Sequence, residues 1–245
     1  MRATLNLIKT EFKEIEKRTF PRFPFSNLVF KISFSEGNVS YFSVKDFSFT
    51  GMQINIEDFE KQCFQFQPGK ILNGNIKWDG DCLHVQAKIE WIKKESIGLS
   101  FNISEKFKKD IYDFLSPQKI ISHLKALHFL EIAKNYSNNL KYWLKADGVF
   151  ELFIWEYSMT GISKIQMSYL GEYVEWEESL GFKTAKIIRQ KNLDRPLTPE
   201  DELVFEVDEV ISSTKIQNCL ELIQNIPENF LSKEALYFLN LKLRV

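Results

Sequence analysis

The spacing of hydrophobic residues differs between successive parts of this chain. Over residues 4–17, apolar side chains recur every three or four positions, with charged side chains on the other face: Leu5, Ile8, Phe12 and Ile15. This spacing predicts an amphipathic helix. Pro21 disfavours helical backbone in the residue before it, so we expect the helix to end near Thr19.

Between residues 28 and 101 apolar and polar residues alternate with a period of two. This alternation predicts six short strands, at residues 29–34, 39–44, 52–56, 70–78, 83–92 and 97–101. Turn signals such as Pro68-Gly69 and Asp79-Gly80 separate them. Short strands of this kind predict a six-stranded antiparallel β barrel. Ser104 is expected to cap a helix at residues 105–115.

The second half mixes both spacings. A helical pattern covers residues 118–135, and strand-like stretches follow at 143–157, 163–176 and 182–189. Residues 200–212 combine a helix start with a strand-like run and stay ambiguous. Two helical patterns, at 214–225 and 231–242, end the chain. We therefore expect an α+β module after the barrel.

These patterns predict four segments. They are an N-terminal amphipathic helix at residues 1–17, a barrel domain at 18–116, a linking helix at 117–139, and an α+β module of unknown function at 140–245.

Composition removes several classes of protein. The 245 residues carry 32 basic and 33 acidic side chains, so no global basic excess exists to attract nucleic acid or a membrane surface. No apolar run is long enough to span a membrane, and the start lacks the apolar core of a secretory signal. Cys63, Cys82 and Cys219 are odd in number and widely spaced, which favours reduced, mostly buried thiols in a cytosolic protein over a disulfide framework or zinc site.

Two short motifs carry the candidate chemistry. The first is Arg18-x-x-x-Arg22, before the first strand; the second is Asp46-x-Ser48-x-x-Gly51, inside the strand pattern. In this order they resemble the PilZ domain family, whose small barrels bind the bacterial second messenger cyclic di-GMP. The resemblance covers about residues 16–116. It includes the stretches 89–92 and 98–101, which look like the last strand pair of the family.

The resemblance implies a ligand site, and the chemistry of the residues suits it. A planar guanidinium of Arg18 or Arg22 can bind the N7 and O6 acceptors of guanine, or a phosphate. Asp46 can accept from guanine N1–H and the 2-amino group, and Ser48 can donate to phosphate. Gly51 would give close backbone approach or a positive φ, and Lys17 would add charge to the loop. The ligand that the resemblance implies is cyclic di-GMP, and it implies no other cofactor or metal.

Each motif also has a simpler interpretation. The arginines are compatible with solvated cations at a helix end, and Asp46 and Ser48 with ordinary turn residues. The carboxylates at 175–178 and 200–202 suit solvated faces better than a catalytic pair.

The sequence therefore predicts a cytoplasmic cyclic di-GMP receptor, not an enzyme, that passes ligand binding to a protein partner through its C-terminal module. One alternative is a degenerate barrel that binds only protein. Another is an enzyme in residues 140–245 gated by the nucleotide, for which no catalytic motif is present.

Overall fold

The computed structural model describes residues 27–33, 38–56, 66–93, 95–129, 139–147, 149–157, 161–189 and 204–244. The described residues divide into two compact units, with the boundary between Ser116 and Pro117. The predicted helix at residues 1–17, together with Lys17, Arg18 and Arg22, lies outside the described residues.

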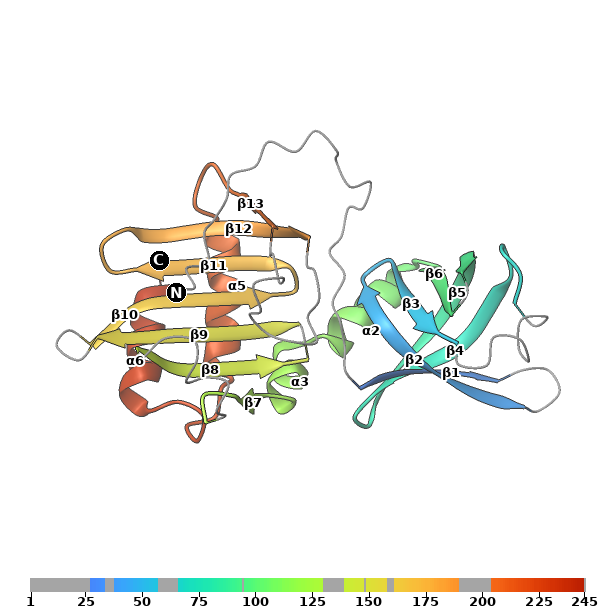
Figure 1. Ribbon diagram of the computed structural model, residues 1–245, viewed down its shortest axis with the longest axis horizontal. Helices are drawn as coiled ribbons and strands as arrows, with labels where there is room; N and C mark the ends of the chain where they lie inside the picture. Colours follow the sequence, from blue (N-terminus) through green and yellow to red (C-terminus); the bar gives the residue numbers. More distant parts are fainter. Residues whose placement is uncertain are drawn as a thin grey trace. The chain divides into compact units, whose positions relative to one another are not determined.

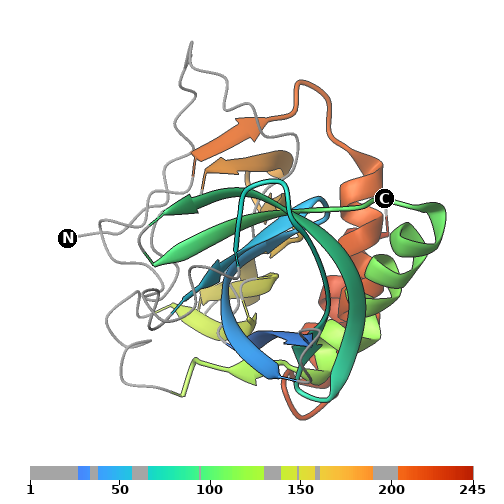
Figure 2. The same ribbon diagram turned by 90° about the vertical axis from the view of Figure 1, so that its right-hand side faces the viewer.

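The first unit is a closed barrel of six antiparallel strands, which confirms the predicted fold. The strands are β1 (Leu28–Ser33), β2 (Val39–Ser48), β3 (Gly51–Asn55), β4 (Ile71–Trp78), β5 (Asp81–Lys93) and β6 (Ser96–Phe101). Their order around the barrel is β1-β2-β3-β6-β5-β4, and Figure 2 shows the ring they form. The alternation seen in the sequence places one set of side chains inside the ring and the other on its outer surface.

Aromatic side chains fill the barrel and bind a helix to it. Helix α2 (Glu105–Phe114) begins at the predicted cap, where Ser104 Oγ accepts a hydrogen bond from the Phe107 backbone N–H at 3.1 Å. Its last residue, Phe114, packs against the rings of Phe47 and Trp78 at 6.3 and 5.9 Å between centroids. All three side chains are fully buried, so α2 completes the barrel core.

The second unit is a seven-stranded antiparallel sheet with helices. Helix α3 (Pro117–Ser122) precedes β7 (Lys125–Ala126), β8 (Leu140–Ala146), β9 (Phe150–Tyr157), β10 (Gly161–Tyr169), β11 (Glu172–Glu177), β12 (Gly181–Arg189) and β13 (Val204–Val207). Each strand pairs with its neighbour in sequence. Helices α5 (Ser213–Gln224) and α6 (Lys233–Leu243) follow and lie against one face of the sheet (Figure 1). This confirms the α+β class.

Contacts with α5 and α6 show which side chains point toward the helices. On β11, Trp176 packs against Phe238 of α6 at 5.4 Å, and Glu172 accepts a hydrogen bond from Asn218 of α5 at 3.0 Å. Because successive residues of a strand point to opposite faces, Tyr173, Glu175 and Glu177 point away from the helices.

Three expectations for the second half need correction. The helix predicted over 118–135 is wrong, because α3 ends at Ser122 and the next residues pair with β8 as strand β7. The stretches 143–157 and 163–176 each contain two strands, separated by turns in which Asp147 and Leu170 have positive φ. The ambiguous stretch 200–212 contains strand β13.

Among the described residues, no helix has both the length and the apolar character needed to cross a membrane.

Candidate functional site

The second motif lies on the outer surface of the barrel, at the pairing of β2 with β3. Phe47 and Met52 oppose each other and are fully buried inside the barrel. The flanking pairs therefore point outward: Asp46 opposite Gln53, and Ser48 opposite Gly51. An irregularity between Val44 and Asp46 resets the alternation, so that Asp46 and Ser48 share the outer face.

Ser48 is committed to its own turn. Its hydroxyl donates to the Gly51 carbonyl at 3.0 Å and accepts from the Thr50 N–H at 3.4 Å, and the residue is buried. This is the turn role that the sequence left as the simpler interpretation. A hydroxyl has one proton to donate, so Ser48 could donate to a phosphate only after its hydrogen bond to the Gly51 carbonyl is broken.

Gly51 is required by close approach and not by a positive φ. Its φ lies outside the left-handed region, and an added Cβ would lie 2.2 Å from the Leu99 carbonyl oxygen of β6. The close approach expected at this glycine is thus to the barrel's own backbone.

Strand register places the chain entry near the motif. Val29 at the start of β1 pairs with Ser43, so β2 continues through Asp46 to Ser48 past that end of β1. Arg22 precedes Leu28 by six residues, a span of at most ~20 Å when extended. Strand β1 therefore begins at the end of the barrel where Asp46 and Ser48 lie.

The sequence did not identify the aromatic residue on this face. Trp91 of β5 opposes Gly98 of β6, and its ring lies across Gly98, where a Cβ would be 2.1 Å from the indole. Gly98 also pairs with Gln53, which is the partner of Asp46. Asp46, Gln53 and Trp91 thus form one row over the outer face. The only signal in the sequence was Gly98 in an otherwise regular strand, a sign of close packing.

A charged group lies beside this row. Glu90 accepts a hydrogen bond from Ser100 at 2.6 Å and pairs with Lys88 at 3.3 Å. The hydrogen bond from Ser100, and then that from Lys88, hold the pKa of Glu90 below its ordinary value. Glu90 therefore stays ionised on this surface near neutral pH.

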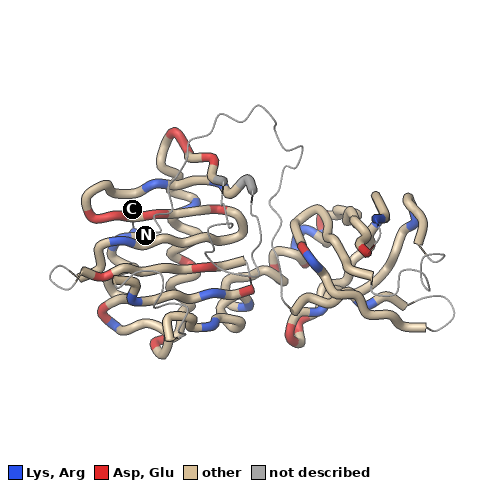
Figure 3. Tube along the Cα trace, in the orientation of Figure 1, with Lys and Arg blue, Asp and Glu red and all other residues tan. Residues whose placement is uncertain are grey.

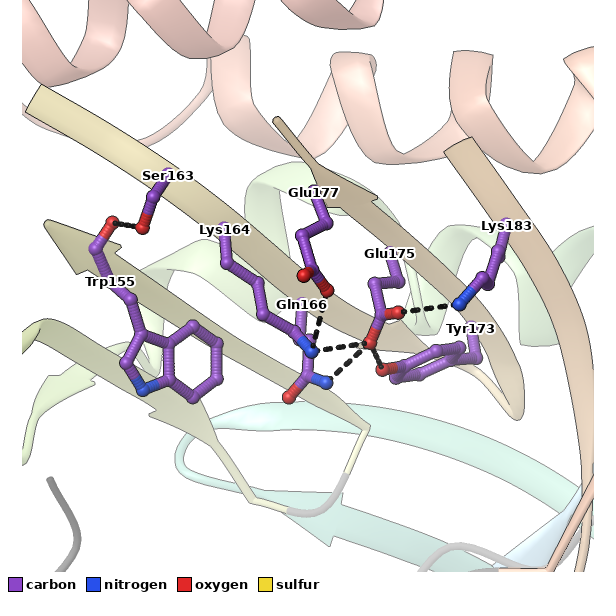
Figure 4. Close-up of polar contacts among 8 residues, drawn as sticks. All are labelled: Trp155, Ser163, Lys164, Gln166, Tyr173, Glu175, Glu177 and Lys183. Carbon is purple, nitrogen blue, oxygen red and sulfur yellow. Dashed lines mark hydrogen bonds and ion pairs between the residues drawn. The ribbon is translucent and has the colours of Figure 1, made fainter. Parts of the chain in front are cut away.

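In the second unit, the expectation of a solvated carboxylate face is wrong for Glu175. Glu175 is 3% exposed, and four side chains from β10, β11 and β12 surround it (Figure 4). Gln166 Nε2 and Tyr173 Oη donate to its Oε2 at 2.5 and 2.8 Å. Lys164 lies 3.2 Å from Oε2, and Lys183 lies 3.7 Å from Oε1.

The surroundings of Glu175 argue against a role as a catalytic acid. Burial alone would raise its pKa, but donation by Gln166, the charge of Lys164 and donation by Tyr173 hold the pKa below its ordinary value. A general acid near pH 7 needs a raised pKa and a proton to give. Glu175 has neither, so it does not suit that role.

Other candidate groups carry no site. Cys82 is exposed, against expectation, and Cys219 is buried, while Cys63 lies outside the described residues. Within the described part of the chain, no group of three histidine, cysteine or acidic side chains is placed to hold a metal ion. Figure 3 shows that the described strands of the second unit carry both basic and acidic positions.

Comparison with known proteins identifies the first unit. Residues 16–116 match the PilZ domain family, and no curated protein matches the chain. Among solved structures, the PilZ domain with c-di-GMP of YcgR from Escherichia coli is 13% identical, with a TM-score of 0.34, covering 40% of this chain and 88% of that one.

Two longer solved proteins are also similar. YcgR from Escherichia coli in complex with c-di-GMP is 14% identical, with a TM-score of 0.34; 41% of this chain and 45% of that one are covered. The K. pneumonia MrkH–c-di-GMP complex is 15% identical, with a TM-score of 0.35; 49% and 56% are covered. The likeness therefore spans about half of each of these two proteins. From the family match and its closed six-stranded barrel, residues 16–116 of this chain are a PilZ domain.

Proposed function

We propose that this protein is a cyclic di-GMP receptor whose second unit passes ligand binding to a protein partner. The observation that carries the proposal is the placement of the second motif. Asp46 and Ser48 share one outward face of β2, at the end of the barrel where β1 begins, and Arg18 and Arg22 precede β1 in the sequence. The PilZ match adds support over the same residues.

The proposed contacts follow from charge and shape. Arg18 and Arg22 bind the phosphates or the Hoogsteen edges of guanine, and Lys17 adds positive charge beside them. Asp46 accepts from the Watson–Crick edge of one guanine. Trp91, whose ring lies beside Gly98 with Lys93 Nζ 5.3 Å from its centroid, offers a surface on which a base can stack. Ser48 and Gly51 act chiefly by fixing the turn that presents Asp46.

Transmission follows from chain connectivity. The arginines lie between the predicted N-terminal helix and β1, so a ligand held by them restrains the path of the chain before the barrel. Such a ligand shifts a conformational equilibrium only by its difference in affinity for the two states. In this proposal the partner binds to a surface of the second unit.

Isothermal titration calorimetry with cyclic di-GMP tests the site. We expect binding by the unaltered protein, and a loss of about 1–3 kcal/mol of binding free energy in Arg22→Ala, because one bidentate contact is removed. Arg18→Ala should weaken binding similarly. Arg244→Ala, an exposed arginine of the second unit, is the matched control and should bind normally.

Two results would overturn the proposal. Equal affinity in Arg22→Ala and the unaltered protein would place the ligand elsewhere. No heat and no thermal shift with the unaltered protein would instead favour the degenerate barrel that meets only protein partners.

A further inference from the structure

The second motif continues into a row of polar groups across the outer surface of the barrel. Ser48 of β2 pairs with Gly51 of β3, which pairs in turn with Ser100 of β6. Ser100 pairs with Lys88 of β5. The residues on either side of Ser100 and of Lys88 are buried, so both side chains point outward, as Asp46 does. Two cross-strand spacings, about 10 Å in all, separate Ser48 from Ser100.

Two donors in this row converge on one anionic oxygen. Ser100 Oγ donates to Glu90 Oε1 at 2.6 Å, and Lys88 Nζ lies 3.3 Å from the same oxygen. A hydroxyl and an ammonium directed at one point also suit a phosphate oxygen, because carboxylates and phosphates accept charge-assisted hydrogen bonds alike. The carboxylate of Glu90 therefore marks a small anion site that the protein fills with its own side chain.

An irregularity in β5 accounts for the position of Glu90. The register of β5 with β6 shifts between Ile89 and Trp91, which leaves Glu90 as an extra residue without a partner opposite it. Such β-bulges change the direction of a side chain relative to a regular strand. The carboxylate thereby reaches the hydroxyl of Ser100 instead of lying opposite a single residue of β6.

The ion pair at this site is exposed to water. The side chains of Lys88 and Glu90 are 53% and 44% exposed. Exposed ion pairs contribute little to stability, since water screens the charges and two long side chains lose freedom. Glu175, by contrast, is buried among its partners. The barrel can therefore lose the contact between Lys88 and Glu90 at little cost, and an external anion can replace the carboxylate.

We propose that Ser100 and Lys88 form a second phosphate subsite for cyclic di-GMP, and that Glu90 fills this subsite until the ligand displaces it. The inference rests on the proposed receptor function. The dinucleotide carries two phosphodiesters, so this subsite can bind one of them while Arg18 and Arg22 bind the other.

The negative charge of Glu90 gives the displacement a cost. Hydrogen bonds from Ser100, and then from Lys88, hold the pKa of Glu90 below its ordinary value, so the carboxylate is charged near neutral pH. It therefore competes with the ligand for two donors and repels the ligand's own charge. In this way Glu90 lowers the affinity of the site.

Calorimetry with cyclic di-GMP tests this competition. Glu90→Gln should bind the ligand several-fold more tightly than the unaltered protein, because a neutral amide holds the two donors less strongly and does not repel phosphate. Glu95→Gln is the matched control. It makes the same charge change at an exposed carboxylate in the turn between β5 and β6, and should bind as the unaltered protein does.

Removal of the donors gives a second readout in the same measurement. Lys88→Gln should weaken binding several-fold, whereas Lys77→Gln, at an exposed position of β4, should leave it unchanged. In the Glu90→Gln background, Ser100→Ala should also weaken binding several-fold, because the hydroxyl then donates to the ligand. No effect of Ser100→Ala in that background would show that Glu90 acts by charge repulsion alone, and would overturn the subsite.

The outcomes separate this inference from the receptor function. Equal affinities of Glu90→Gln and Glu95→Gln, in a protein that still loses affinity in Arg22→Ala, would overturn the subsite and leave the receptor in place. No heat with the unaltered protein and none with Glu90→Gln would remove both. Binding by Glu90→Gln but not by the unaltered protein would support both.

Discussion

Gly51 lies where β3 approaches β6, and a methyl group there would be 2.2 Å from the Leu99 carbonyl oxygen. Gly51→Ala should therefore push backbone against backbone and destabilise the barrel by about 1–3 kcal/mol. Gly98→Ala is the matched comparison, because its methyl would meet only the side chain of the partly exposed Trp91, which can move aside. Urea unfolding should show the larger loss for Gly51→Ala. A larger loss for Gly98→Ala would mean that the backbone of β6 moves aside more easily than the side chain of Trp91.

Trp91 provides a second test at the residue scale. If a guanine stacks on its indole, Trp91→Ala should weaken cyclic di-GMP binding by about 1–3 kcal/mol, as measured by calorimetry. The barrel should stay folded because Trp91 points outward and its partner is a glycine. Trp155→Ala in the second unit is the control and should bind normally. Unchanged affinity in Trp91→Ala would remove this residue from the site.

These residues show what sequence can reveal about a site. Asp46, Ser48 and Gly51 lie within six positions of one another, so their grouping is visible in the chain. Trp91 joins them only through the pairing β2-β3-β6-β5 and an irregularity between Ile89 and Trp91, neither of which a local pattern contains. The burial of Glu175 was missed for the same reason, since a charged residue in a strand usually faces water.

Among the elements, helix α2 begins at the cap predicted from the sequence and contributes its last residue, Phe114, to the barrel core. Phe114→Ala should destabilise the barrel by about 3–5 kcal/mol, because it removes a fully buried ring packed on Phe47 and Trp78. Thermal or urea unfolding of the full chain measures the loss. Lys109→Ala, exposed on the same helix, should have little effect. Comparable losses in the two variants would mean that α2 contributes through its backbone alone.

The predictions of secondary structure failed where a hairpin has the same alternation as one long strand, and where a strand follows residues with helical spacing. All six barrel strands were recognised, since turn signals such as Pro68-Gly69 and Asp79-Gly80 separate several of the alternating runs. The period of two gives no sign of a tight reversal, so β8–β9 and β10–β11 were each read as one stretch, although Asp147-Gly148 and Leu170-Gly171 were present. After Ser122, pairing with β8 outweighs the helical spacing.

At the scale of the molecule, two units with separate cores should respond differently to acid. The depressed pKa of Glu175 means that its contribution to stability is complete above its unfolded value of about 4.3 and is lost as pH falls below that value. Glu175→Gln should be less stable than the unaltered protein at pH 7, and the difference should narrow as pH falls through about 4.

Urea unfolding followed by tryptophan fluorescence, at several pH values, measures this difference. Glu177→Gln is the control, since Glu177 is partly exposed and pairs with Lys164 at 3.3 Å. Its effect should be small and should vary little with pH. A stability difference for Glu175→Gln that stays constant with pH would show that the carboxylate is not a source of acid sensitivity.

The lengths of the outermost strands have a consequence for how the protein behaves at high concentration. The sheet of the second unit ends in β7, of two residues, on one side and in β13, of four, on the other. Unpaired backbone groups along a sheet margin are templates for the strands of other molecules, and short margins offer few of them. The barrel, being closed, has no margin at all. The described strands of both folded units therefore offer few unpaired backbone groups to which another molecule could add a strand. Strand addition of this kind is the route to amyloid-like fibres.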